Sequence, residues 1–168
     1  ELRKVQAELA ELGFPVVAIS AERPERLAQS LEAGDLGYAL YSDRTLAAAR
    51  AFGIAFQLGD AEVARYKEHG IDLEAESGLD HHQLPVPSVF LVGPGGRIRW
   101  VYSNPDYRVR PENAQILEAA RELRAQGFNA LSMTWDLIET TIRTRLEGQR
   151  TQGMNYLSAL SRGVLLSE

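Results

Sequence analysis

The chain has 168 residues, of which 45% are hydrophobic, so it is long enough to bury one sizeable core and to carry an appended element. Its formal net charge of -5 at pH 7 argues against nucleic acid or an anionic membrane surface as the main partner. Cysteine is absent, which excludes a disulfide framework and any thiol chemistry by these residues alone.

The sequence has no pattern typical of a membrane-spanning helix or a signal peptide. No apolar run approaches the roughly 20 residues that a spanning helix needs, and no signal-peptide pattern opens the chain. We therefore expect a cytoplasmic protein without a membrane partner. Because the first residue is Glu rather than Met, we also expect a segment upstream of Glu1.

The N-terminal part of the chain alternates helical and extended patterns. Residues 1–12 place apolar side chains at helical spacing, and Gly13 stands where such a helix stops. Residues 15–20 form a continuous apolar run that is typical of a buried parallel strand. A helix is predicted over 24–34, where Pro24 suits the first turn.

A second strand and a second helix follow the same order. Residues 38–41 are a strand candidate, and Asp43 is predicted to cap a helix over 44–52 that Gly53 ends. Capping alone accounts for an aspartate at this position. The alternation of strand, loop and helix implies crossover connections and a layered α/β architecture.

Residues 54–84 are the least regular region of the sequence. A short helix is predicted over 61–69, with Val63 and Tyr66 facing inward. Residues 71–83 are acidic and polar, and we expect a long loop there, which in a compact domain is usually functional or mobile.

Two adjacent histidines, His81 and His82, invite a metal interpretation. Neighbouring side chains diverge in an extended segment, so two neighbours seldom bind one ion, and cysteine is not available to complete a site. We expect solvated loop histidines, and we predict neither a metal nor a cofactor.

The strongest local signal is a β-hairpin over 86–102. Proline cannot donate to a strand ladder, so Pro87 belongs before the first strand. Residues 89–92 are apolar on both faces, as in a strand covered on both sides. Residues 97–102 alternate and should leave one face in solvent. The Gly-Pro-Gly-Gly link at 93–96 has the composition of a turn.

A turn at 104–107 leads into a helix that Gly127 ends. One face of this helix is apolar, as the spacing of a buried helix requires. The face consists of Ile116, Leu117, Ala120 and Leu123.

Residues 126–168 form a separate helical extension in this interpretation. They carry a narrow apolar stripe on an otherwise polar helix, and such a stripe has to be buried on the domain or on another subunit. We therefore consider a homo-oligomer formed through Leu131, Trp135, Ile138 and Ile142.

The hairpin and the segment after it resemble a known family. The sequences VPSVFLV (86–92), GG (95–96), RIRWVY (97–102) and NPDYRVRP (104–111) are similar to the second half of a peroxiredoxin-like protein of the AhpC/TSA (redoxin) family. The resemblance covers roughly residues 1–125. It implies a thioredoxin-like, three-layer α/β sandwich with a central mixed sheet, which would lack its N-terminal strand and redox cysteine motif.

The same resemblance implies an active-site neighbourhood, although no catalytic residue is present without cysteine. In thioredoxin-like members the proline that opens this strand is cis and faces the redox cysteine, which points to Val86 and Pro87. The family's Asp-Tyr-x-x-Arg element includes Arg110.

Four arginines gather around the hairpin and its exit. They could help to stabilise a thiolate, because a nearby cation lowers the pKa of sulfur. The other interpretation is a solvated face opposite the acidic loop. The four are Arg97, Arg99, Arg108 and Arg110, and Arg110 is the first to test.

Two functional hypotheses follow. The resemblance implies a thiol oxidoreductase that reduces peroxide and is restored by a thiol reductant, with its cysteine upstream of Glu1. The alternative is a redox-inactive scaffold whose C-terminal helices assemble subunits or dock a partner, since thiol catalysis needs a nucleophile that these residues lack. The sequence leaves the peroxide, the reductant and the oligomeric state open.

Overall fold

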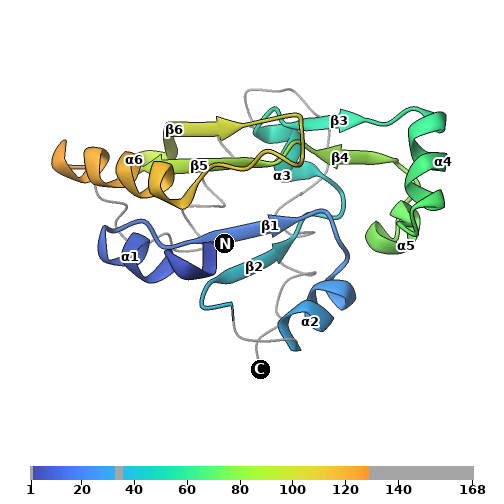
Figure 1. Cartoon of the computed structure of the whole chain (residues 1–168), viewed down its shortest axis with the longest axis horizontal. Coiled ribbons are helices and arrows are strands. Elements are labelled where there is room, and N and C mark those ends of the chain that lie inside the picture. The colour runs from blue at the N-terminus through green and yellow to red at the C-terminus, as the bar shows by residue number, and fades with distance from the viewer. Residues whose placement is uncertain (1, 33–35, 129–168) are drawn as a thin grey trace. The chain divides into compact units, whose positions relative to one another are not determined.

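The computed structural model describes residues 2–32 and 36–128 (Figure 1). These residues divide into two compact units. The first unit combines residues 2–17, 36–39 and 86–128, and the second combines residues 18–32 and 40–85. Both units contain helices and strands, which confirms the predicted α/β class. Of the extension predicted over 126–168, residues 129–168, which carry its apolar stripe, lie outside the described residues.

The N-terminal helix of the first unit is present but starts irregularly. A 3₁₀ turn, η1 (Leu2–Lys4), precedes α1 (Gln6–Glu11). Val5 and Leu9 are buried, because their spacing places them on one face of the chain. Gly13 follows the helix with a φ of 88°, a left-handed conformation that glycine adopts without steric cost.

The predicted hairpin is confirmed in the first unit. Strand β5 (Ser88–Gly93) pairs antiparallel with β6 (Arg97–Ser103), and a 3₁₀ turn, η2 (Pro94–Gly96), joins them. Exposed and half-buried residues alternate along β6, as expected for a strand with one solvated face. The register shifts beside Leu91, which leaves Arg99 without a cross-strand partner, as in a β-bulge.

A single hydrophobic cluster holds the first unit together. It joins α1, β5 and the helix α6 (Asn113–Ala125), whose apolar face is buried as predicted. The buried members of the cluster are Val5, Leu9, Phe14, Leu91, Ile116, Leu117, Ala119, Ala120 and Leu123. Two polar links between helices add to it, because Arg121 pairs with Glu8 and Arg124 Nη1 donates to the Leu12 carbonyl at 3.1 Å.

The second unit begins with the predicted strand and helix pair. Strand β1 (Val17–Ser20) lies beside β2 (Ala39–Ser42), and α2 (Pro24–Glu32) starts at its proline as expected. The prediction that β1 is fully buried was wrong. Its residues are half-buried at best, and the side chain of Ile19 is 41% exposed because it lines an open cavity.

Asp43 caps the next helix, α3 (Ala47–Ala51), which starts three residues later than predicted. Its carboxylate accepts the amide hydrogens of Ala48 at 3.1 Å and Ala49 at 2.9 Å. Leu46, between Asp43 and the helix, has a φ of 55° and a fully buried side chain. Burial of this leucine offsets the steric cost, on the order of 1 kcal/mol, of a left-handed conformation.

The region 54–84 is more ordered than the sequence indicated. It contains β3 (Ala55–Gln57), α4 (Asp60–Glu68), α5 (Leu73–Ser77) and β4 (Gln83–Pro85). Helix α4 and its half-buried Val63 and Tyr66 match the prediction, whereas the predicted polar loop over 71–83 was wrong.

Local caps explain the helix that the prediction missed. Asp72 accepts the amide hydrogen of Ala75 at 3.0 Å, and Gly78 ends α5 in the left-handed conformation. The five residues of α5 are too few to show the repeating apolar spacing of a helix. The acidic composition was then the remaining signal, and it led to the prediction of a loop.

Strand pairing in the described ranges gives three two-stranded sheets: β1 with β2, β3 with β4, and β5 with β6. The β3–β4 pair is antiparallel, with Phe56 opposite Leu84. None of the helices in residues 2–32 and 36–128 has the length and apolar character of a membrane span.

Candidate functional site

Val86 and Pro87 lie immediately before β5, where the sequence placed them, and both are half-buried. The peptide bond between them is trans, as are all peptide bonds of the described residues, so the expected cis proline was wrong. That expectation came from the family resemblance, because the local sequence fits a trans proline opening a strand equally well.

Hydrogen bonds tie this entry to the far end of the hairpin. The Pro87 carbonyl accepts the amide hydrogen of Asn104 at 3.3 Å, and the Ser88 hydroxyl donates to the Val86 carbonyl at 2.9 Å. The hydroxyls of Ser88 and Ser103 are 2.8 Å apart. The proline therefore lies beside the exit of β6, which leads towards Arg110.

The exit itself is a polar turn, as predicted. Asn104 Oδ1 accepts the amide hydrogen of Asp106 at 2.9 Å, and Asp106 accepts both Nε and Nη2 of Arg108 at 2.9 Å. These bonds from Arg108 lower the pKa of Asp106 to about 2, and the carboxylate in turn raises the pKa of Arg108. The Arg108 guanidinium is therefore paired with Asp106.

The four arginines of the hairpin region have different environments. All are exposed, as the solvated-face interpretation requires. Arg99 lies over the Phe128 ring at 4.2 Å, and Arg108 pairs with Asp106. The side chains of Arg97 and Arg110 make no hydrogen bond or ion pair with residues that the structure describes. The charge of Arg110 nevertheless acts on Asp106, because it helps to lower the pKa of that carboxyl.

The two histidines were predicted to be solvated loop residues, but the side chains of both make hydrogen bonds within the protein. His81 Nδ1 accepts the Gln83 amide hydrogen at 3.0 Å, and its Nε2 lies 2.8 Å from the Arg44 carbonyl. His82 Nε2 lies 2.8 Å from Glu74 Oε1, and its backbone has a φ of 47°. Arg44 is 37 positions from His81, so the sequence alone could not indicate this contact.

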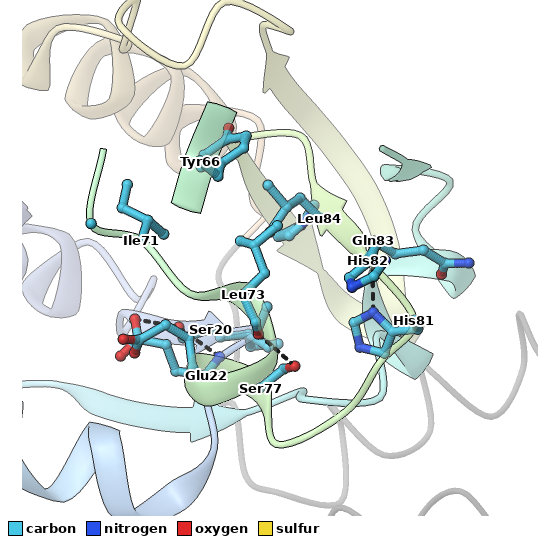
Figure 2. A pocket seen from close by; sticks show the side chains of 15 residues that line it. Ser20, Glu22, Tyr66, Ile71, Leu73, Ser77, His81, His82, Gln83 and Leu84 are labelled. Atoms are coloured by element: carbon cyan, nitrogen blue, oxygen red, sulfur yellow. Dashed lines mark hydrogen bonds between the residues drawn. The ribbon is translucent and has the colours of Figure 1, made fainter. Parts of the chain in front are cut away.

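Both histidines line a cavity of about 520 Å³ in the second unit (Figure 2). Its walls come from the end of β1, from the stretch between α4 and α5, and from β4. Tyr66, Ile71 and Leu84 surround the open space, and Glu22 lies next to Ser20 at one side (Figure 2). No sequence pattern indicates this cavity, because its lining comes from separate segments without a shared motif.

Groups of three or more histidine or acidic side chains suited to a metal ion do not occur in residues 2–32 and 36–128. The 168 residues contain no cysteine, so neither the hairpin entry nor the cavity holds a thiol from this sequence. The polar turn after β6 lies beside Pro87, whereas Arg97 and Arg99 lie at the other end of the hairpin, and the cavity offers an apolar space with carboxylates.

Comparison with known proteins gives one significant match. The model of the AhpC/TSA family matches residues 1–101, from the N-terminus into β6. No curated protein and no solved structure matches significantly. Arg110 and α6 lie beyond the matched residues. Because the match covers more than half of the chain, the protein belongs to the AhpC/TSA family, whose members have the thioredoxin fold.

Proposed function

We propose that this protein is a peroxiredoxin-like antioxidant enzyme that reduces peroxides with a cysteine located outside residues 1–168. The observation that carries the proposal is the family match over residues 1–101, since the AhpC/TSA family is in general one of thiol-dependent peroxidases and oxidoreductases. Action in the cytoplasm, with a thiol compound or thiol protein as reductant, is part of the same proposal.

The chemistry needs one nucleophilic sulfur. A thiolate attacks one oxygen of the peroxide bond, the O–O bond breaks, and the other oxygen leaves as water or an alcohol after protonation. The sulfur, oxidised by two electrons to sulfenic acid, is then reduced by two thiols, which form a disulfide and release water. The described residues contribute binding and charge to this cycle.

In this proposal Val86, Pro87 and Arg110 form the surroundings of the sulfur. The support for Pro87 is its place at the strand entry, held by the Asn104 amide hydrogen. The support for Arg110 is its place in the family's Asp-Tyr-x-x-Arg element and its exposed guanidinium, whereas Arg99 lies over the Phe128 ring and Arg108 pairs with Asp106. A cation at that place would favour the thiolate over the thiol.

Peroxide consumption by the natural protein tests the proposal. With dithiothreitol as reductant, the natural protein should consume hydrogen peroxide, and dimedone should label one cysteine as sulfenic acid in mass spectrometry. A chain of residues 1–168 should show neither, because it has no thiol. A natural protein without cysteine, or one with cysteine but no peroxide consumption, would refute the proposal.

Replacing Arg110 with glutamine in the natural protein should lower kcat/KM for peroxide by about tenfold, the value of one hydrogen bond to a charged group. The pH at which half the cysteine reacts with iodoacetamide should rise as well, because the thiolate loses a cation. Arg97→Gln is the matched control, since Arg97 is an exposed arginine of the same hairpin. Equal effects of the two variants would exclude Arg110 from the site.

The absence of cysteine favours a second candidate, a redox-inactive scaffold that assembles through residues 131–142. Sedimentation of the full chain should then show an oligomer, and Trp135→Glu should convert it to monomer because the charge cannot be buried at low cost. Glu139→Gln, in the same segment, should leave the mass unchanged. A monomeric wild-type chain would rule out this candidate.

A further inference from the structure

The cavity of the second unit has the size of a small-molecule site. Its volume of about 520 Å³ falls in the range of roughly 300 to 1,000 Å³ that small ligands occupy. All of its lining residues belong to one compact unit, so its shape does not depend on the other unit. The hydrogen bonds of His81 to Arg44 and Gln83 fix one wall in place.

The apolar part of the lining is unusually exposed. Ile19 and Ile71 are 41% and 43% exposed, and both face this cavity rather than a packed core. Tyr66 and Leu84 add an aromatic ring and a further branched side chain to the same space (Figure 2). An apolar ligand body would remove these side chains from water, which is the main favourable term in such binding.

The charge of the lining is negative. Glu22 and Glu76 line the cavity, and no lysine or arginine does. Glu76 already pairs with Arg26 at 3.1 Å. Glu22 has no ion pair with the part of the chain that the structure describes, and its carboxylate accepts only the Ser20 hydroxyl, at 3.2 Å. One half-buried carboxylate therefore lacks a cation.

The backbone holds Glu22 in this position. Its carbonyl accepts the hydroxyl of the buried Ser42 at 2.6 Å, and its amide donates to Ser20 Oγ at 3.3 Å. The carboxylate itself accepts the Ser20 hydroxyl at 3.2 Å. A carboxylate beside an apolar space, without a cation of its own, is suited to bind a ligand ammonium group.

From these observations we propose that the cavity binds a small organic cation, an ammonium group on an apolar body, with Glu22 as its counter-ion and Tyr66, Ile71 and Leu84 around the apolar part. The site uses no thiol and lies entirely in residues 18–85, so it does not depend on the proposed peroxidase activity.

Calorimetric titration of the full chain with three matched probes tests the proposal. The probes are 4-phenylbutylamine, the neutral 4-phenylbutanol and the anionic 4-phenylbutyrate. The amine should bind about fivefold more tightly than the alcohol, as expected for one partly exposed ion pair, and the carboxylate should bind most weakly. Equal binding of amine and alcohol, or no binding of the amine, would overturn the proposal.

Variants then assign the two parts of the site. Glu22→Gln keeps an acceptor for the Ser20 hydroxyl but removes the charge, so it should abolish the preference for the amine over the alcohol. Glu25→Gln, an exposed position on α2 outside the cavity, is the control and should keep the preference. Ile71→Ser should weaken the amine and the alcohol together. An undiminished preference in Glu22→Gln would refute the role of this carboxylate.

Discussion

Replacing Ile116 with alanine is expected to lower the free energy of unfolding by about 3 kcal/mol, the largest effect of any single change considered for this protein. The Ile116 side chain is 2% exposed, and it belongs to the cluster in which α6 packs on α1 and β5. Alanine loses the transfer free energy of the removed carbons and leaves a cavity that these elements close only in part.

Urea unfolding followed by circular dichroism measures this loss. Ile116→Val removes only one methyl group and should cost about 1 kcal/mol. Glu118→Ala is the matched control, because Glu118 is exposed on the same helix and its replacement should stay within about 0.5 kcal/mol of wild type. If Ile116→Ala costs no more than Glu118→Ala, the described core of the first unit is incorrect.

Replacing Asp43 with alanine is expected to destabilise the second unit by about 2 kcal/mol. The Asp43 side chain is 2% exposed, and its two oxygens accept the amide hydrogens of Ala48 and Ala49. Alanine leaves both amides buried without an acceptor, and water cannot reach them easily. The variant is measured by urea unfolding at pH 7, beside wild type.

The contribution of Asp43 to the free energy of unfolding should also fall as pH rises, which is the reverse of the usual behaviour of an aspartate. Burial raises its pKa above the ordinary value of 3.8, and the amide hydrogens of Ala49, Ala48 and Ala47 oppose this only in part. The folded state therefore holds the proton more tightly than the unfolded state. Stability relative to the non-titrating Asp43→Asn variant should be greatest below pH 3.8, and should fall as pH rises through the raised pKa.

Asp72 is the control, because its contribution to stability should change with pH in the opposite direction. It also caps a helix, but it is exposed, and the Ala75 amide hydrogen lowers its pKa. Its contribution, measured against Asp72→Asn, should be present above pH 3.8 and should be lost as pH falls through the lowered pKa. Equal pH trends for the two caps would contradict the buried environment of Asp43.

Local signals predicted most of the elements correctly. Alternating side chains, a Gly-rich turn and prolines before the strand specified the hairpin over 88–103, because a strand and its turn are determined by neighbouring residues. The apolar face of α6 followed from helical spacing for the same reason. Helix α5 and strand β4 were missed, since each is too short to show a period.

The candidate sites could be predicted only in part. Val86, Pro87 and Arg110 were proposed from a family resemblance and stay a prediction, and the structure corrects the expected cis bond before Pro87 to a trans bond. The cavity around Glu22 could not be found, because its lining residues lie up to 66 positions apart, from Ile19 to Pro85. No spacing rule connects residues that meet only through the packing of several elements.

The sequence by itself determined the α/β class, the hairpin, the capping by Asp43 and the lack of any thiol in these residues, since each depends on residue type or on neighbours along the chain. Only the tertiary structure decided that Glu22 lies beside an apolar cavity without an ion pair in the described residues. It also decided that His81 and His82 are hydrogen-bonded, and that Arg99 lies over Phe128. Pairing and burial are set by contacts between distant segments, and those contacts exist only once the chain has folded.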